Sequence, residues 1–397
     1  MLSVASASVR RMRLLHTSDW HLGRTLHGVD LLDHQAAYLD HLVEVVDAEG
    51  VDAVVVAGDV YDRAIPPVEA VTLLSETLAR LADRTTVVVT SGNHDSATRL
   101  GFGAALMRER VRLRTRVASL AEPVEVGDGL VYGLPYLDPD ACRAELAPVA
   151  QDGTRTLLAR SHAAVTTAAM ARVRADAATR GGRRVVVAAH AFVVGGLASE
   201  SERDIRVGGV DHVPAGVFEG ADYVALGHLH GPQVVPGPDG TVLRYSGSPL
   251  AYSFSEQHHA KSSVLVDLSG GAPVTTLVPA PVPRRLADVT GTLEELLGAT
   301  GEPHVDDWVR VTVTDAVRPA DLFRRVRTRF PHALVVQHRP ERAPEEVSRA
   351  ALVTAAADPV AVAADFVAHV TGGAPSPAEL RVLREAYEHV TAAERSA

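Results

Sequence analysis

Five short apolar runs, each ending in side chains that can bind a metal ion, constrain this chain more than any other feature. The runs are rich in valine and nearly continuous in apolar residues, which is typical of strands buried on both faces within an α/β structure. Aspartate and histidine follow the first run, and the other runs deliver further oxygen and nitrogen ligands at the same end. The candidate ligands, in chain order, are Asp19, His21, Asp59, Asn93, His190, His228 and His230.

The shared position of these ligands predicts one site. In open α/β sheets, ligands bind outside the carboxyl ends of the strands, so residues far apart in the chain converge there. Carboxylate, amide and imidazole ligands without thiolate favour Mn, Fe, Zn or Mg over a closed structural zinc site. Seven groups exceed what one ion needs. We therefore expect two ions that share a bridging carboxylate and lie about 3.5–4 Å apart, an arrangement that clamps the attacking and leaving oxygens of phosphoryl transfer.

Each ligand taken alone has a plainer interpretation. A single histidine near a strand end, such as His190, is more often a structural residue than a ligand. Asp59 alone would be interpreted as an N-cap or turn carboxylate, which is common after a strand. The agreement of five strand ends in order and residue type is what favours a shared metal site.

The order and spacing of the ligands resemble those of the calcineurin-like metallophosphoesterase superfamily. The motifs that carry this resemblance are Asp19-X-His21, Gly58-Asp59-X-X-Asp62, Gly92-Asn93-His94-Asp95, His190 and Gly227-His228-X-His230. The segments 17–24, 199–204, 223–230 and 245–250 are similar to the SbcD subfamily, the bacterial Mre11-type nuclease subunits. The resemblance covers nearly the whole chain. It implies an α/β fold, a two-layer or four-layer sandwich with a small α+β cap domain and a C-terminal helical tail.

The resemblance also implies a division of the ligands between two divalent ions, with Mn²⁺ as the expected metal. One ion would be held by Asp19, His21 and His230, and the other by Asn93, His190 and His228. Asp59 would bridge them. A water molecule activated by the ions would be the nucleophile, because coordination lowers the pKa of water towards neutrality.

Three residues beside the ligands receive other roles from the resemblance. His94 would be the catalytic residue, positioning the scissile phosphate and assisting the leaving oxygen. Asp62 and Asp95 would accept hydrogen bonds from ligand imidazoles or from the backbone, which fixes the tautomer of a ligand.

The composition is that of a multidomain enzyme rather than a uniformly basic nucleic-acid binder. The chain has 397 residues and a formal net charge of -10, so two or three domains are expected and DNA contacts would need a local arginine stripe or a partner. No uncharged apolar run reaches about 18 residues, so we expect no membrane span. The single cysteine, Cys142, excludes an intrachain disulfide and fits the reducing cytoplasm.

Motif positions and a proline-rich linker at 279–283 divide the chain into four regions, whose roles are those that the resemblance implies. These are an extension over 1–12, a nuclease domain over 13–280, a DNA-binding cap over 283–344 and a helical tail over 345–397. Within the nuclease domain we expect crossover helices over 31–47 and 66–81, and an alanine-rich helical insertion over 140–180. In the cap we expect a β-α-β unit with strands over 308–314 and 333–337 and a helix over 319–329.

Arginines gather in the predicted cap. By resemblance, the candidate contacts to the DNA backbone are Arg24, Arg284, Arg285, Arg324, Arg325 and Arg327. The competing interpretation is a solvated helix face or an exposed loop cation. The tail predicts two helices, over 346–370 and 377–392, which by resemblance would dock on an SbcC-like ATPase in a heterotetramer. A helical hairpin packed on its own domain is the alternative.

The expected function is a metal-dependent DNA nuclease that hydrolyses phosphodiester bonds at duplex ends and hairpins, in DNA repair, replication and recombination. A homodimer through helices near 66–81 and 99–110 is implied by the resemblance. A small-molecule phosphodiesterase or phosphatase on the same scaffold is one alternative, but it would not require the arginine cap or the tail. A non-catalytic subunit that binds DNA ends is the other, although such a subunit has no chemical need for His94 beside a complete ligand set.

Overall fold

The computed structural model describes residues 12–107, 109–149, 152–202, 212–340, 358–371 and 373–394. The predicted extension therefore lies outside the described residues, except for Met12. Met12 is buried, its amide donates a hydrogen bond to Ser269 Oγ, and its side chain packs against Gly129. Met12 thus belongs to the folded body, and the part of the predicted extension that can be described was assigned wrongly.

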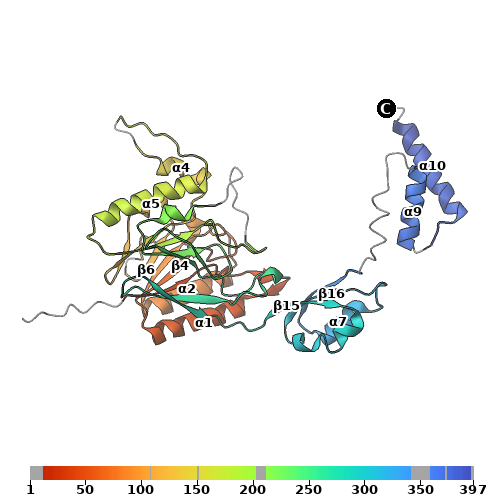
Figure 1. Cartoon of the computed structure of the whole chain (residues 1–397), viewed down its shortest axis with the longest axis horizontal. Helices are drawn as coiled ribbons and strands as arrows, with labels where there is room; N and C mark the ends of the chain where they lie inside the picture. The colour runs from red at the N-terminus through yellow and green to blue at the C-terminus, as the bar shows by residue number, and fades with distance from the viewer. Residues whose placement is uncertain are drawn as a thin grey trace, which may run out of the picture. The chain divides into compact units, whose positions relative to one another are not determined.

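Among the described residues, two six-stranded sheets form the centre of the body (Figure 1). The order in the first sheet is β14 (Val274–Pro279), β13 (Ser262–Asp267), β1 (Arg13–Thr17), β4 (Ala53–Ala57), β5 (Thr86–Thr90) and β6 (Val111–Arg114). The order in the second is β11 (Gln233–Val235), β12 (Val242–Tyr245), β10 (Tyr223–Gly227), β9 (Arg184–His190), β8 (Gly129–Gly133) and β7 (Val124–Val126). Strands β1, β4, β5 and β6 run parallel, as do β12, β10, β9 and β8.

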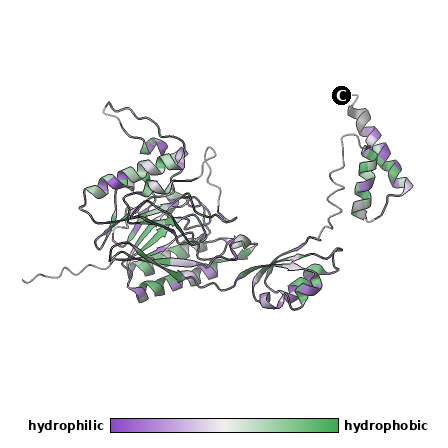
Figure 2. Ribbon diagram, in the orientation of Figure 1, coloured by the Kyte–Doolittle hydropathy of each residue, from purple (hydrophilic) through white to green (hydrophobic). Residues whose placement is uncertain are grey.

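The two sheets pack face to face, with helices on both outer sides. In β4, Val54 and Val56 join the core under α1 (Leu32–Glu49) and α2 (Val68–Ala82), whereas Val55 faces the second sheet. Strand β9 alternates in the same way, because Val187 lies in the core under α4 (Pro139–Leu146) and α5 (His162–Ala178) and Val186 lies between the sheets. Figure 2 shows these strands as apolar segments inside the body. The predicted α/β sandwich is confirmed, and of the two-layer and four-layer forms left open it is the four-layer one.

The helices follow local signals. Helix α1 ends at Gly50, whose φ of 57° suits the left-handed C-cap position that glycine adopts at low cost. Helix α2 begins directly after Pro66 and Pro67. Both crossover helices are confirmed within two residues of their predicted limits. The predicted helical insertion contains two helices, α4 and α5, and the chain between them includes Pro148, which cannot donate a backbone hydrogen bond.

The predicted cap contains one strand more than expected. Its sheet has the order β15 (Leu286–Gly291), β16 (Trp308–Val313) and β17 (Ala333–His338), with α6 (Leu293–Leu297) after β15 and α7 (Leu322–Arg329) between the other two. The β-α-β prediction missed β15. This strand is short, follows an arginine pair, and contains the polar residues Asp288 and Thr290, so its apolar pattern is weak. Helix α7 begins three residues after Pro319, and Val326 and Phe330 bury its inner side.

The tail is a hairpin of α9 (Pro359–Thr371) and α10 (Pro377–Glu394), which pack on each other. Ser376 and Glu379 form a capping box: the Ser376 amide donates to Glu379 Oε2 at 2.7 Å, and Ser376 Oγ accepts from the Glu379 amide at 3.4 Å. The predicted second helix is confirmed. The first was predicted from residue 346, but residues 346–357 lie outside the described part of the chain. Within that part, no helix is long and apolar enough to cross a membrane.

Candidate metal centre

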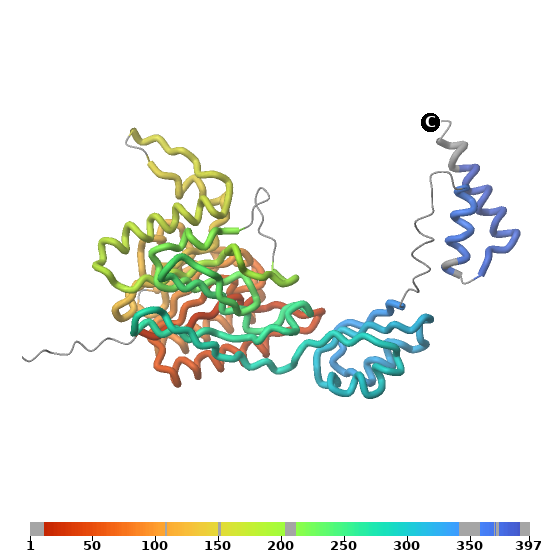
Figure 3. The backbone as a smooth tube through the Cα atoms, viewed as in Figure 1, coloured from red at the N-terminus to blue at the C-terminus, as the bar shows by residue number. Residues whose placement is uncertain are grey.

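All candidate ligands lie where strands of the two sheets end. Strands β1, β4 and β5 of the first sheet lead to Asp19, Asp59 and Asn93, and β9 and β10 of the second lead to His190 and His228. Figure 3 shows that these segments, which are far apart in the sequence, belong to one folded body. The loops are also tied together, since the Asp19 amide donates to Gly58 O at 3.1 Å and the His21 amide donates to Asp59 O at 3.0 Å.

The backbone is strained at several of these side chains. Positive φ angles occur at Asp19 (55°), His21 (46°), Asp59 (48°) and His228 (104°). Residues other than glycine rarely adopt such angles, and each costs on the order of 1–3 kcal/mol. Such backbone strain persists only where the surrounding structure holds it, and it is commonest at functional sites. Its presence at four candidate ligands therefore supports a functional site here.

Glycines allow the loops to approach one another. A Cβ atom on Gly92 would lie 2.1 Å from Asp59 Oδ1, and one on Gly227 would lie 1.9 Å from the carbonyl oxygen of Ala57. A Cβ on Gly58 would lie 2.5 Å from His190 Nδ1. The glycine that precedes each ligand in three motifs is therefore required by contact with the neighbouring loop.

Among the described residues, three groups of side chains bring their ligand atoms within 4.8 Å of one another. The groups are Asp19, His21 and His230; Asp19, Asp59 and His190; and His21, Asp59 and His94. Asn93 Oδ1 joins the second group at 2.8 Å from His190 Nε2. His228 is in none of the three groups, but its buried ring lies 5.4 Å from that of His190.

Several of these nitrogen and oxygen atoms face each other at distances that require a proton or a metal ion between them. His190 Nδ1 donates to Ala57 O at 2.9 Å, which leaves Nε2 facing Asn93 Oδ1 and, at 3.4 Å, Asp59 Oδ2. His21 Nε2 and His230 Nε2 lie 3.2 Å apart. A lone pair cannot face another acceptor stably unless a proton or a metal ion intervenes. The donor set therefore fits divalent metal ions.

The electrostatics of the cluster agree with this fit. Burial raises the pKa of Asp19 to about 6, and burial together with the nearby His190 lowers the pKa of His228 to about 3. Burial opposes charge on His190 as well, yet the Asp59 carboxylate raises the pKa of His190 to about 9. A proton on His190 thus balances the Asp59 carboxylate, and a metal ion would replace that proton, because neutral imidazole is the form that binds metal.

His94 is the most exposed of the clustered histidines, at 8%. Its Nδ1 donates to the backbone oxygen of Asp62 at 2.8 Å, and its amide donates to Asp59 Oδ1 at 2.8 Å. The first bond places the hydrogen of the neutral ring on Nδ1, so Nε2 carries the lone pair. The ring meets that of His21 edge to face at 4.6 Å.

The two remaining aspartates hold neighbouring loops. Asp95 accepts backbone hydrogen bonds from Val60, Tyr61 and Gly92 at 2.9–3.1 Å, and burial together with the charge of Asp59 raises its pKa to about 7. Asp62 Oδ1 lies 3.6 Å from His21 Nδ1 and 3.2 Å from Arg24 Nη1.

The candidate DNA-contact arginines differ in their surroundings. Arg24 is largely buried, since it pairs with Asp62 and lies over the Tyr252 ring, 4.9 Å from its centre. Arg285 is exposed and lies 3.4 Å from Asp307, and Arg284 donates to the backbone oxygen of Asp306. The arginines on the exposed side of α7 are Arg324, Arg325 and Arg327.

The sequence analysis missed the residues that lie on the Nδ1 side of the His230 ring, away from His21. Glu256 Oε1 lies 3.2 Å from His230 Nδ1, and Lys261 pairs with Glu256. No spacing signal points to Glu256. Lys261 does carry one signal, because it is the only lysine in the sequence.

Comparison with known proteins agrees with this geometry. Residues 12–232, more than half of the chain, match the calcineurin-like phosphoesterases. The chain belongs to this family. Residues 282–371 match the family described as the type 5 capsule protein repressor C-terminal domain. The SbcD subunit of the nuclease SbcCD from Bacillus subtilis (strain 168) is 40% identical over 278 residues, which cover 66% of this chain and 68% of that protein. The chain is therefore a homologue of the SbcD nuclease subunits, and the predicted resemblance is confirmed.

Two solved structures also match. A dimetal phosphatase from Danio rerio is 14% identical, with a TM-score of 0.41, and the match covers 67% of this chain and 98% of that one. The protein TT1561 of Thermus thermophilus is 13% identical, with a TM-score of 0.38, and the match covers 67% of this chain and 99% of that one. The family assignment depends on the sequence matches alone.

Proposed function

We propose that this chain is the nuclease subunit of an SbcC-SbcD-type complex and hydrolyses phosphodiester bonds at duplex ends and hairpins. The observation that carries the proposal is the buried cluster in which carboxylate, amide and imidazole atoms face one another at the carboxyl ends of two sheets. The 40% identity to a nuclease subunit supports DNA as the substrate.

We propose that the ligand set binds two ions. Asp19, His21 and His230 would hold one, and Asn93, His190 and His228 the other, with Asp59 between the two sets. Bound there, divalent ions, Mn²⁺ in this proposal, would activate water as the nucleophile and offset the negative charge of the phosphate. The chain itself supplies the fixed geometry, because four of these residues are held in strained backbone conformations.

His94 would act on the leaving group. As water attacks phosphorus, the bond from phosphorus to the sugar oxygen breaks and that oxygen needs a proton. His94 Nε2 is the nitrogen placed to donate it, because Nδ1 is held by Asp62 O. Such acid catalysis typically contributes about 10²- to 10⁴-fold. Asp62 and Asp95 would keep the surrounding loops in register.

Residues 13–280 would carry the chemistry and residues 283–344 would contact DNA. The exposed arginines of α7, Arg324, Arg325 and Arg327, together with Arg284 and Arg285, would bind backbone phosphates. Arg24 is the exception among the predicted contacts, because Asp62 already satisfies part of its guanidinium. We propose that Arg24 reaches a phosphate only while it also holds Asp62.

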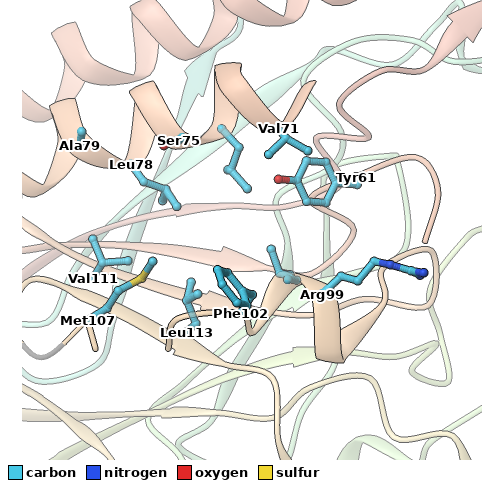
Figure 4. A pocket seen from close by; sticks show the side chains of 12 residues that line it. Tyr61, Val71, Ser75, Leu78, Ala79, Arg99, Phe102, Met107, Val111 and Leu113 are labelled. Atoms are coloured by element: carbon cyan, nitrogen blue, oxygen red, sulfur yellow. The ribbon is translucent and has the colours of Figure 1, made fainter. Parts of the chain in front are cut away.

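A homodimer through the nuclease domain is supported by an apolar groove of about 410 Å³ between α2 and the segment after α3 (Ala97–Leu100). Figure 4 shows Val71 and Leu78 on one wall and Phe102 and Met107 on the other. Phe102 is 85% exposed, which is unusual for a phenylalanine in a single chain. We propose that a second copy of the chain covers this groove.

The tail over 345–397 would bind the SbcC-like ATPase in a heterotetramer. Its two described helices leave large apolar side chains exposed, among them Phe366 at 66% and Val382 at 63%. Such residues are typical of a helical surface that a partner covers. We further propose that the complex acts in the cytoplasm in DNA repair, replication and recombination.

The test is cleavage of a linear duplex with one hairpin end by the purified chain in Mn²⁺, beside the His94→Ser form. We expect Mn²⁺-dependent cutting that falls by about 10²- to 10⁴-fold in the variant, because the acid is lost while the ligands remain. If no DNA is cut but a small phosphodiester is still hydrolysed, the result would support the general phosphodiesterase alternative or strict dependence on the ATPase partner. DNA-end binding without any metal-dependent hydrolysis would instead support the non-catalytic alternative.

A further inference from the structure

A buried group of polar side chains lies behind His230, on the side opposite the cluster. While His230 Nε2 faces His21, its Nδ1 faces Glu256 and Ser201. Glu256 is 1% exposed and Lys261 is 4% exposed. Neither residue contacts the reacting atoms in the mechanism above. A buried carboxylate and ammonium are costly to desolvate, so their presence beside one ligand calls for an explanation.

Glu256 determines which nitrogen of His230 carries the proton. Its Oε1 accepts from His230 Nδ1 at 3.2 Å, from the Tyr252 amide at 3.2 Å and from the Ser201 hydroxyl. A carboxylate can only accept from His230, so Nδ1 bears the hydrogen and Nε2 presents its lone pair towards the cluster. Ser201 Oγ also lies 2.8 Å from Nδ1, which restricts rotation of the ring further.

Lys261 holds both Glu256 and the backbone of His230. Its Nζ donates to Glu256 Oε2, to Ser248 Oγ at 2.9 Å and to His230 O at 3.0 Å. All three ammonium donors therefore have an acceptor. The chain has 39 lysine and arginine residues together, and this is the single lysine. A compact ammonium can reach three converging acceptors in a closed space, whereas a planar guanidinium fork cannot.

The segment from 199 to 202 adds a further contact to the same ligand. Glu202 Oε1 accepts from the His230 amide at 2.9 Å, and its other oxygen binds the amide and hydroxyl of Ser199. This is the described part of the segment over 199–204 that resembles the SbcD subfamily. His230 is thus held through its ring, its amide and its carbonyl oxygen.

We propose that Glu256 and Lys261 are positioning residues that set the tautomer and orientation of His230 for metal binding. The inference rests on the proposed function, in which His230 is a ligand. Carboxylates that hydrogen-bond the second nitrogen of a ligand histidine raise its basicity and fix its ring, and their loss typically lowers metal affinity by about 10- to 100-fold.

The experiment is a titration of the metal-free full chain with Mn²⁺, in which the electron paramagnetic resonance signal counts the free ion. Three variants are compared with the parent chain. Glu256→Gln keeps the shape but removes the charge. Glu256→Gln combined with Lys261→Met removes both buried charges together, so no unpaired ion is left to unfold the protein. Tyr132→Phe is the matched control, because it loses only a buried hydroxyl whose 2.7 Å bond to Asp176 lies elsewhere.

We expect the parent chain and Tyr132→Phe each to bind two ions. The affinity of each site should be the same in the two proteins. Both Glu256 variants should bind one ion normally and the other about 10- to 100-fold more weakly. Two sites of unchanged affinity in the Glu256 variants, or equal weakening of both sites, would overturn the positioning role. Absence of Mn²⁺ binding by the parent chain would instead overturn the proposed function.

Discussion

At the scale of single residues, the site depends on backbone positions as much as on its ligands. Asp59 and His228 adopt positive φ angles, and each follows a glycine that touches the neighbouring loop. The strain, on the order of 1–3 kcal/mol per residue, is offset by packing in the surrounding sheets. The glycines in the motifs are therefore structural requirements of the centre.

Gly92→Ala tests this directly. The added methyl would lie 2.1 Å from Asp59 Oδ1, so Asp59 must move away from both ligand sets. We expect loss of Mn²⁺-dependent cleavage and destabilisation by about 1–3 kcal/mol in denaturant unfolding, as for other overpacked sites. The control is Gly216→Ala, since nothing lies within 4 Å of a Cβ there. Full activity in Gly92→Ala would contradict the account.

The convergence of the candidate ligands could be predicted from the sequence because each one follows an apolar run, and a run has a recognisable pattern. Glu256 could not, because it lies 26 residues from His230 in the chain and in a short 3-10 turn (Phe254–Glu256). Its contact depends on tertiary packing that no local spacing expresses. The strained φ angles were also beyond prediction, since aspartate and histidine rarely adopt them.

At the scale of elements, α7 separates into a buried and a charged side. Leu322, Val326 and Phe330 are buried in the cap, whereas Arg324, Arg325 and Arg327 are exposed. An exposed basic side on a helix can bind phosphates without a net positive charge on the whole chain. The charge of the chain, -10, is therefore compatible with DNA binding.

Reversing Arg324 and Arg325 to glutamate should weaken binding to duplex DNA. If each contacts one phosphate, the slope of log affinity against log salt should fall by about two. Hydrolysis of a small phosphodiester should not change, because α7 supplies no ligand. The comparison variant is Arg116→Glu, an exposed arginine outside the cap. An unchanged affinity and salt slope in the double variant would exclude α7 from the DNA interface.

Elements were predicted best where periodicity was long. The crossover helices α1 and α2 carry several turns of apolar positions and were located within two residues. Strand β15 was missed because it is short and its polar positions lie in a loop-like sequence. The alanine-rich insertion was predicted as helical because alanine favours helix, but the prediction did not locate the break between α4 and α5, where Pro148 and Gly153 lie.

At the scale of the whole molecule, the exposed groove beside α2 predicts a dimer. The Phe102→Asp substitution replaces the most exposed aromatic side chain of that groove with a charged carboxylate. We expect light scattering after size exclusion to show a dimer for the parent chain and a monomer for this variant. Leu157→Asp is the control, since Leu157 is 54% exposed on the insertion instead. A monomeric parent chain at micromolar concentration would refute this surface as the interface.

We propose that seven side chains from the two sheets bind two metal ions. Anomalous diffraction at the manganese absorption edge, from crystals grown with Mn²⁺, tests this. We expect two peaks: one beside Asp19, His21 and His230, the other beside Asn93, His190 and His228, with Asp59 next to both. A single peak, or peaks away from these side chains, would exclude a two-ion centre at these residues.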